Sequence, residues 1–276
     1  MPNVRIDIEE LEKKANWIRK QVLQTVFQTK KGHIGGTFSC TDILIALYYG
    51  SFLRVDPRNP AWKYRDRLIL GKGHACLALY NILVDMGFFD ASRLADYGKN
   101  GGSLSGQLNI DTPGVEYNTG SLGHAIGVGA GMALAARLDG NIYRVFAIVG
   151  DGECAEGSVW ESVMFASKNK LNNLIAIVDR NRLSVTEVIE EDETFGSLAG
   201  RFGACGWKCI SIDGHSFEEL TSVFNKLDEL QRPLAVIANT VKGKGISFME
   251  NGIKWHHSIP NQEEFDLAMK DLESVL

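Results

Sequence analysis

The stretch AIVGDGECAEGSVWE, residues 147–161, joins an apolar run to a cluster of acidic residues. The run YRVFAIVG, residues 143–150, predicts a buried strand. Asp151 follows it directly, between Gly150 and Gly152, and an amphipathic helix is predicted to come next. A strand that ends in a glycine-flanked carboxylate and leads into a helix indicates one strand–helix unit of an α/β fold.

The same alternation of strands and helices continues beyond this stretch. Apolar and amphipathic runs predict strands over residues 173–179, 207–213 and 233–240, and helices over residues 158–170, 196–206 and 216–230. Such alternation is typical of βαβ units, which place parallel strands in one sheet and helices on both of its faces. We therefore predict the α/β class with a parallel sheet, and a single domain over residues 1–276.

The N-terminal half is predicted to be mostly helical. Apolar residues at helical spacing predict helices over residues 7–30 and 41–49. Residues 67–88 are interpreted as a short strand, a glycine turn and an apolar helix, and residues 98–119 as a loop. Residues 120–138, rich in glycine and alanine, are predicted to form a helix that a ligand or another backbone could approach closely.

The composition favours a globular protein of the cytoplasm. The chain has 276 residues, a formal net charge of −5 and 45% hydrophobic residues, so it can bury a large core. The acidic balance disfavours a nucleic-acid partner, and no run approaches the roughly 20 apolar residues of a membrane span. The N-terminus lacks the apolar core of a signal peptide. Five irregularly spaced cysteines are typical of reduced thiols, and we expect Cys205 and Cys209 to be a buried pair.

Oxygen-bearing side chains follow two of the predicted strands. Asp151 follows the first, and Asn181 follows the next strand along the chain, about one strand–helix–strand unit later. The carboxyl ends of parallel strands meet at one edge of a sheet, where ligands bind. A carboxylate and an amide oxygen suit Mg²⁺, or Ca²⁺ or Mn²⁺, that also holds phosphate oxygens. These residues predict a site for a metal and a diphosphate, although a GDG sequence also occurs in ordinary turns.

Six motifs, in their order along the chain, carry a resemblance to a known family. They are KKGHIGG, GKGHACLALY, TPGVEYNTGSLG, GDGECAEGSVWE, NNLIAIVDRNRL and WHH. Together they resemble the N-terminal half of transketolases, and most closely the diphosphate-binding N-terminal subunit of split, two-gene transketolases. The resemblance implies a thiamine diphosphate-binding fold with thiamine diphosphate and Mg²⁺ as cofactors. It also implies transfer of a two-carbon ketol unit from a ketose or ketose phosphate donor to an aldose acceptor.

The resemblance implies roles for individual residues. The metal ligands would be the side chains of Asp151 and Asn181 and the carbonyl of Leu183. Catalytic roles fall to three histidines, His33, His74 and His256. Further residues are expected to bind the cofactor, and Glu156 is expected to be buried in a carboxylate network across the dimer interface. The full set of expected cofactor contacts is His74, Gly120, Leu122, Gly150, Asp151, Gly152, Glu156, Asn181, Lys244 and His256.

Two positions depart from the family pattern and bear on the substrate. Gln107 stands where the family carries a histidine that hydrogen-bonds the donor sugar, and His124 stands where the family usually has glutamine. Glutamine can bond a hydroxyl group but cannot take up a proton at pH 7. With His33, which resembles a sugar-contacting histidine, these residues are the candidate substrate contacts. The two changes favour an unusual ketose, or another acyloin donor or acceptor.

Three further residues have weaker assignments. His257 follows His256 where the family more often has glycine, so either ring could face the site. His215, in the polar turn DGHSFEE, is expected to be a surface or capping residue. Glu153 is expected to be a charge at the start of a helix.

The sequence shows no second α/β unit that could bind the aminopyrimidine ring of the cofactor. We therefore expect a C-terminal partner subunit, an α2β2 heterotetramer and an active site between the two kinds of chain, with sugar phosphates or related ketoses and aldoses as substrates. One open alternative is a different thiamine diphosphate enzyme, such as a 1-deoxyxylulose-phosphate synthase-like or acyloin-forming subunit. A non-catalytic scaffold subunit is the other. A dinucleotide-binding dehydrogenase is disfavoured because no G-x-G-x-x-G motif follows a predicted strand.

Overall fold

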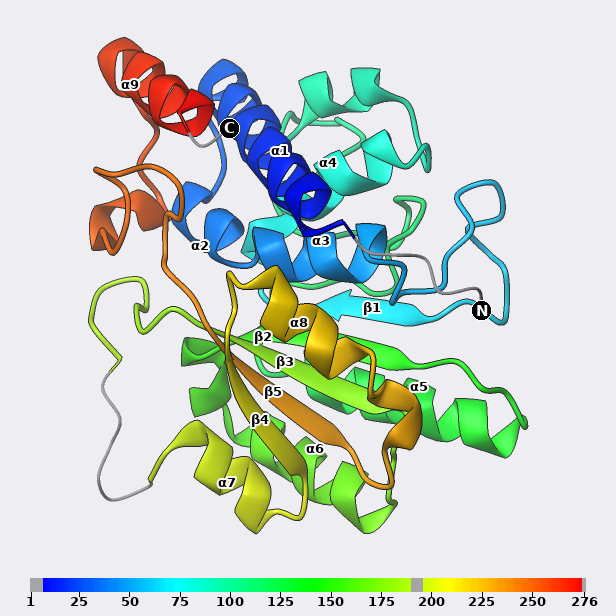
Figure 1. Cartoon of the computed structure of the whole chain (residues 1–276). Coiled ribbons are helices and arrows are strands. Elements are labelled where there is room, and N and C mark those ends of the chain that lie inside the picture. The colour runs from blue at the N-terminus through cyan, green and yellow to red at the C-terminus, as the bar shows by residue number, and fades with distance from the viewer. Residues whose placement is uncertain (1–6, 190–195, 275–276) are drawn as a thin grey trace.

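A parallel sheet lies between two layers of helices in the computed structural model, which describes residues 7–189 and 196–274 (Figure 1). The strands are β1 (Arg67–Leu70), β2 (Val145–Gly150), β3 (Leu174–Arg180), β4 (Lys208–Asp213) and β5 (Leu234–Asn239). They pair in the order β1-β2-β3-β5-β4, and every pair is parallel. The predicted α/β class with a parallel sheet is confirmed.

Helices cover both faces of this sheet. One layer, above the sheet in Figure 1, contains α1 (Ile8–Thr29), α2 (Ile34–Ser39), α3 (Thr41–Tyr49), α4 (Cys76–Asp85), α8 (Phe217–Phe224) and α9 (Gln262–Glu273). The other contains α5 (Ala125–Leu138), α6 (Gly157–Lys168) and α7 (Leu198–Ala204). Short 3₁₀ turns lie at Gly73–Ala75, Ala91–Asp96, Gly152–Ala155, Leu227–Glu229 and Ile253–His256.

The strands divide their side chains between the two helical layers. Phe146 and Ile148 of β2 belong to the core on the α1 side, whereas Ala147 and Val149 belong to the core on the α5 side. Successive residues of a strand point to opposite faces, and all four of these are fully buried. A strand buried on both faces has no polar side to display, which explains why its sequence is a continuous apolar run.

The first helix closely matches its predicted bounds. Asp7 caps α1 by accepting a hydrogen bond from the backbone N–H of Glu9 at 3.1 Å, and Lys30 ends it in a left-handed conformation. Its buried stripe, which includes Leu11 and Ile18, packs against α3 and α4. This packing fixes the loop after α1, which carries His33 into the candidate site.

Two predicted helices are shorter than expected. The helix expected over residues 120–138 begins only at Ala125, because Gly120 and Gly123 have φ angles of +127° and +88°. Right-handed helices require negative φ. The helix expected over residues 216–230 ends at Phe224, and a 3₁₀ turn follows it.

The cysteines and the helix lengths bear on the expected environment. All five cysteines are free thiols, and Cys205 and Cys209 are half-buried rather than fully buried as expected. Within residues 7–189 and 196–274, no helix is long and apolar enough to cross a bilayer.

Candidate active site

The carboxyl ends of β2 and β3 bring the two predicted metal ligands to one cavity. Gly150 of β2 pairs with Asp179 of β3, so Asp151 and Asn181 leave the sheet at the same edge. Asp151 and Asn181 are each 7% exposed. The cavity has a volume of about 220 Å³, and we call it the strand-end cavity. Its lining residues are Gly36, Lys72, His74, Leu122, Gly150, Asp151, Gly152, Glu153, Asn181, Leu183, Ser184, Val185, Lys242 and His256.

Backbone groups hold the carboxylate of Asp151. Its Oδ1 accepts a hydrogen bond from the N–H of Gly152 at 2.9 Å, and its Oδ2 accepts one from the N–H of Arg182 at 2.6 Å. Burial, together with the neighbouring Asp179 carboxylate, raises the pKa of Asp151 to about 6. A bound dication would reverse this effect, because it stabilises the ionised carboxylate.

Asn181 and Leu183 supply two neutral oxygens beside this carboxylate. The amide of Asn181 is oriented at both ends: Oδ1 accepts from the N–H of Leu183 at 3.1 Å, and Nδ2 donates to the hydroxyl of Ser39 at 3.4 Å. The carbonyl of Leu183 accepts from the ammonium group of Lys242 at 3.3 Å. A carboxylate, an amide oxygen and a carbonyl are hard ligands of the kind that Mg²⁺ prefers.

A buried charge network, which was not predicted from the sequence, supports this edge of the sheet. Asp179, at the end of β3, forms an ion pair with Lys72 and accepts hydrogen bonds from Ser39 at 2.6 Å and from Thr240. Lys72 is only 3% exposed. Burial lowers the pKa of Lys72, but Asp179 raises it above its usual value, so the ammonium form persists beside the cavity. The ionisable residue near the end of an otherwise apolar strand was the signal for this network.

Four histidine rings gather next to the metal-ligand residues. The ring centroids of His33 and His74 are 5.4 Å apart, those of His74 and His256 are 5.2 Å apart, and those of His33 and His257 are 4.6 Å apart. Burial lowers the pKa of His33 to about 4 and that of His256 to about 3, and it also lowers the pKa of His74 well below its usual value. These three rings are therefore neutral imidazoles at pH 7.

Of the two adjacent histidines, His256 lines the strand-end cavity and His257 is exposed. The Nδ1 atom of His256 lies 3.0 Å from Nζ of Lys242, which fixes the ring against the cavity wall. His257 still contacts the cluster, because its ring centroid is 4.6 Å from that of His256.

The lysine that the loop after β5 contributes to this cavity is Lys242 and not Lys244, which was predicted to contact the cofactor. Lys242 is 1% exposed, lines the cavity and donates to the carbonyl of Ser184 at 2.8 Å. Burial, together with the ammonium group of Lys72, lowers the pKa of Lys242 to about 8. Gly243, between the two lysines, has a φ of +81°, and this turn sends the two side chains to different cavities.

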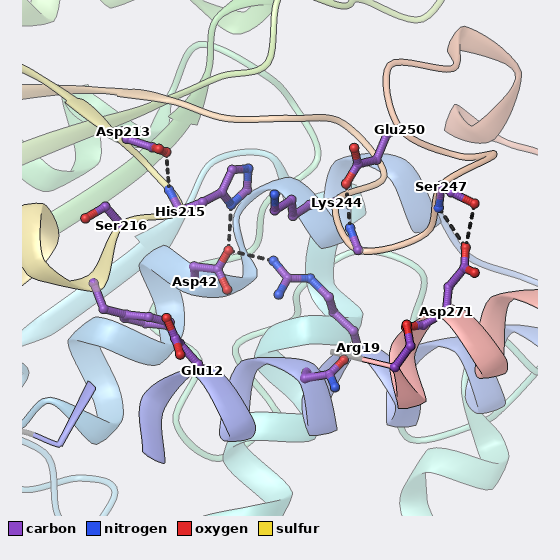
Figure 2. A pocket seen from close by; sticks show the side chains of 14 residues that line it. Glu12, Arg19, Asp42, Asp213, His215, Ser216, Lys244, Ser247, Glu250 and Asp271 are labelled. Carbon is purple, nitrogen blue, oxygen red and sulfur yellow. Dashed lines mark hydrogen bonds and ion pairs between the residues drawn. The ribbon is translucent and has the colours of Figure 1, made fainter. Parts of the chain in front are cut away.

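Lys244 lines a second, larger cavity of about 700 Å³, which we call the Arg19 cavity (Figure 2). Arg19 lies in its wall, is 6% exposed and pairs with Asp42 at 2.7 Å. Figure 2 shows that α1, α9 and the loop carrying Lys244 surround this space. Lys244 is therefore separated from the predicted metal ligands.

His215 is also in the Arg19 cavity, and the expectation that it is a surface or capping residue is wrong. Its Nδ1 atom lies 2.6 Å from a carboxylate oxygen of Asp42 (Figure 2). Its Nε2 atom accepts from the N–H of Val241 at 2.8 Å. The side chain is 10% exposed. His215 thus connects α3, the turn after β4 and the strand end of β5.

The buried glutamate of the GDGECAE motif within this chain is Glu153, which was expected to be a charge at the start of a helix. Glu153 is buried, and its carboxylate accepts from the N–H groups of Gly123 at 3.0 Å and Gly150 at 3.2 Å. Burial raises the pKa of Glu153. Glu156, which was expected to be buried, is exposed on this chain. Burial of Glu156 would require another chain to cover it.

Of the residues predicted to contact the substrate or the cofactor ring, some lie at or near the strand-end cavity and His124 lies outside its lining. Leu122 lines the strand-end cavity, and Gly120 lies close to Gln107, because a Cβ atom built on Gly120 would be 3.1 Å from the glutamine side chain. The Oε1 atom of Gln107 is buried and has no hydrogen-bond partner among the described residues. His124 is not in the cavity lining: it is exposed, and its Nδ1 atom lies 3.2 Å from the carbonyl of Leu122.

The strand-end cavity fits a metal together with a phosphorylated ligand. Its oxygen donors are of the type that Mg²⁺ prefers, and its wall carries the ammonium groups of Lys72 and Lys242. A Cβ atom built on Gly150 would find no atom closer than 4.0 Å, so space remains beside the metal ligands. Fold and site together define an α/β protein with a cavity at the carboxyl edge of its sheet whose donors suit a dication and a phosphorylated ligand.

Comparison with known proteins narrows this class to one family. The family described as "Transketolase, thiamine diphosphate binding domain" matches residues 11–273, and the chain belongs to it. A subunit of the apulose-4-phosphate transketolase of Phocaeicola vulgatus is 40% identical, covering 97% of this chain and 95% of the relative. The 6-deoxy-6-sulfo-D-fructose transketolase subunit of a Clostridium species is 36% identical, with 96% of each covered. The predicted likeness to the N-terminal subunit of a split transketolase, a transferase, is confirmed.

A solved structure agrees with this assignment. The transketolase of Campylobacter jejuni is similar with a TM-score of 0.90 and 29% identity. The match covers 97% of this chain but only 43% of the C. jejuni chain. The chain therefore spans almost the whole length of the P. vulgatus and Clostridium subunits and less than half of this larger transketolase.

Proposed function

We propose that this chain is the cofactor-anchoring subunit of a transketolase-type enzyme that transfers a two-carbon ketol unit from a ketose or ketose phosphate to an aldose. One observation carries the proposal: a single cavity is lined by Asp151, Asn181, His74, Lys242 and His256. This set combines oxygen ligands for a metal, a cation for a phosphate group and neutral imidazoles for proton transfer.

Thiamine diphosphate and Mg²⁺ fit the donors of the strand-end cavity. Asp151, Asn181 and the carbonyl of Leu183 would hold the metal, and Gly152 and Lys242 would face the diphosphate. Bound thiamine diphosphate supplies the carbanion chemistry of ketol transfer, which no protein side chain provides. The protein contributes position, charge and exclusion of water.

His33 and His256 would exchange protons with sugar hydroxyl groups. Their lowered pKa values keep both rings neutral at pH 7, so each has a lone pair that can accept a hydroxyl proton. A bound diphosphate beside His256 would raise its pKa toward neutrality, because a nearby anion favours the imidazolium form. That shift would improve the ring as a general base near neutral pH.

A C-terminal subunit would complete the active site, in an α2β2 heterotetramer. The P. vulgatus relative is named as one subunit of its enzyme, which supports the expectation of a partner chain. Apolar side chains that a partner could cover are exposed on and near α6, including Met164 at 54% and Phe165 at 43%. Exposed Glu156 lies just before that helix, so another chain covering α6 would also bury Glu156.

An uncommon ketose is the proposed donor. Two relatives are named for apulose 4-phosphate and for 6-deoxy-6-sulfo-D-fructose, both outside the ordinary sugar phosphates. The unpartnered Oε1 atom of Gln107 would lie 2.6 Å from a Cβ atom built on Gly73, next to His74. Gln107 is therefore placed to accept a hydrogen bond from a donor hydroxyl near the histidines. His124 does not line the cavity of this chain, and its contact with the substrate stays a prediction.

The experiment is a reconstitution with the C-terminal subunit. The chain alone, the partner alone and their mixture would be assayed for ketol transfer from a panel of ketoses and ketose phosphates, with thiamine diphosphate and Mg²⁺. We expect turnover only in the mixture, and we expect D151N to abolish it while K244M retains it. Turnover by the isolated chain would refute the division of labour.

Two other outcomes would replace the proposal. Release of CO₂ from pyruvate, without ketol transfer, would indicate a 1-deoxyxylulose-phosphate synthase-like activity. Absence of Mg²⁺-dependent cofactor binding by the mixture would indicate a scaffold subunit.

A further inference from the structure

We propose that His33, His256 and His257 form a second metal site, a three-nitrogen site for a Zn²⁺-class transition-metal dication beside the strand-end cavity. This site is separate from the oxygen ligands assigned to Mg²⁺. The metal-binding statement does not depend on the proposed function, because it rests on these three imidazoles alone.

The geometry brings three imidazole nitrogens within reach of one ion. One ligand nitrogen from each ring lies within 4.8 Å of the other two. Four-coordinate Zn²⁺ with Zn–N bonds of about 2.0–2.1 Å needs nitrogens about 3.3 Å apart, so small side-chain rotations suffice. His33 is the N-cap of α2, and the turn Ile253–His256 packs against that helix, so tertiary packing holds the three rings together.

The protonation state of the rings favours a metal. Metals bind neutral imidazole, and burial keeps the pKa of His33 and of His256 far below 7. Nδ1 of His33 is buried and has no hydrogen-bond partner among the described residues, so no protein group competes for it. Nδ1 of His256 contacts Lys242, which leaves Nε2 as the nitrogen available to an ion.

The choice of metal follows from the donor atoms. Imidazole nitrogen suits Zn²⁺, Cu²⁺ and Ni²⁺, whereas carboxylate and carbonyl oxygens suit Mg²⁺. Asp151 and Asn181 of the strand-end cavity belong to the second type, so they and the three histidines prefer different metals. Three protein ligands leave a fourth position of a tetrahedral ion open to water or to a small ligand.

His257 sets this chain apart from the pattern that it otherwise resembles, because the family more often has glycine after the matched histidine. Without His257 only two nitrogens of the triad remain. His257 is exposed, so it can be changed without disturbing the core. His124 offers a matched control, because it is also an exposed histidine but lies outside the cluster.

The ion would inhibit the enzyme if the proposed function holds. His33 and His256 are the rings proposed to exchange protons with the sugar, and a metal would occupy the lone pairs that they need. Zn²⁺ would therefore compete with the ketose and not with Mg²⁺. This step alone rests on the proposed function.

Metal binding is tested on the full chain without a polyhistidine tag. Co²⁺ serves as the spectroscopic probe and Zn²⁺ as its competitor. Excess Mg²⁺ is present to occupy the oxygen ligands. We expect one Co²⁺ per chain with the visible absorption of nitrogen-ligated, low-coordinate Co²⁺, displaced by Zn²⁺. Loss of an outer-shell partner alone weakens metal sites about 10–100-fold, so H257G should weaken Co²⁺ binding by at least about tenfold. H124A should bind as the parent chain does.

Equal Co²⁺ binding by the parent chain and H257G would overturn the metal site, as would octahedral Co²⁺ spectra. The inhibition arm uses the reconstituted enzyme, in which Zn²⁺ should be at least about tenfold less inhibitory toward H257G than toward the parent. If reconstitution gives no activity, the proposed function fails, and the Co²⁺ titration still decides the metal site.

Discussion

The strand-end cavity and the Arg19 cavity contain the same kinds of side chain, but the pKa values of their buried aspartates shift in opposite directions. In the Arg19 cavity, Asp42 is paired with both Arg19 and His215. Burial alone would raise the pKa of Asp42, yet these two partners hold it below its usual value. In the strand-end cavity the pKa of Asp151 rises to about 6 and that of Lys242 falls to about 8, so burial favours the neutral forms.

The direction of the pKa shift distinguishes polar residues that stabilise the fold from polar residues that are suited to bind a ligand. Charged side chains that are paired with one another stabilise the native state, and their charges are already neutralised, so they attract a ligand only weakly. Charges whose neutral forms are favoured are destabilised until an outside ion pairs with them. The larger cavity is therefore the structural one, and the smaller is the candidate active site. Four measurements test this difference between the cavities.

The largest effect is expected from D151N in the reconstituted enzyme. The variant should lose Mg²⁺-dependent binding of thiamine diphosphate, measured by calorimetry, and with it all ketol transfer. In the free chain its free energy of unfolding should be unchanged or higher. Relief of a buried charge, worth about 3 kcal/mol for a pKa raised from 3.8 to about 6, outweighs the loss of a backbone hydrogen bond worth about 1 kcal/mol. Strong destabilisation of the free chain would show that Asp151 is structural.

D42N is expected to lower the stability of the free chain and to leave cofactor binding unchanged, which is the opposite of the result expected for D151N. It leaves the buried guanidinium of Arg19 without its ionic partner, which typically costs about 3–5 kcal/mol. Urea denaturation should show this loss, whereas cofactor affinity per folded molecule should not change. A selective loss of cofactor binding in D42N would contradict the assignment of the Arg19 cavity as structural.

A smaller effect separates the two neighbouring lysines. K242M should weaken Mg²⁺–thiamine diphosphate binding by about 10–100-fold, because it removes the cation that faces the diphosphate. K244M, which changes the same residue type two positions away, should leave that affinity unchanged. Calorimetry of both variants in the reconstituted enzyme makes the comparison, and equal losses would mean that the correction from Lys244 to Lys242 is wrong.

The smallest effect is the pH dependence of stability in the free chain. His33 and His256 have folded pKa values of about 4 and about 3, below the usual 6.5, so the unfolded chain binds more protons. Their contribution to the free energy of unfolding therefore falls as the pH drops from 6.5 toward 4. Asp151 has the opposite effect: because its folded pKa is raised, its contribution to the free energy of unfolding rises as the pH falls below about 6.

Urea denaturation at pH 7.5, 6 and 5 measures this trend. H33Q should lose less stability over that range than the parent chain. The lowered pKa of Asp42 acts below its ordinary value near 3.8, outside the range, so the Asp42 carboxylate should not contribute. Identical slopes for H33Q and the parent would show that His33 is not held neutral by burial.

Most of the fold and half of the candidate site could be predicted because they depend on local patterns. Apolar runs located the strands, and the residues directly after two of them located Asp151 and Asn181. Adjacent parallel strands end at the same edge, so sequence order was enough to bring those oxygens together. The helix predicted at residue 120 failed because positive φ angles at two glycines are not visible in a helical pattern.

The order of strands and helices along the chain, the family and the meeting of Asp151 with Asn181 at one sheet edge could all be predicted from the amino-acid sequence, because each depends on patterns of neighbouring residues. Which charged side chains pair with one another could not be predicted from the sequence. Lys72 with Asp179, and His215 with Asp42, join residues more than a hundred positions apart. The choice of Lys242 over Lys244 at the strand-end cavity likewise emerged only in the folded chain. The physical reason is that a side chain's partner and its pKa depend on packing around it, and packing joins residues that no local pattern connects.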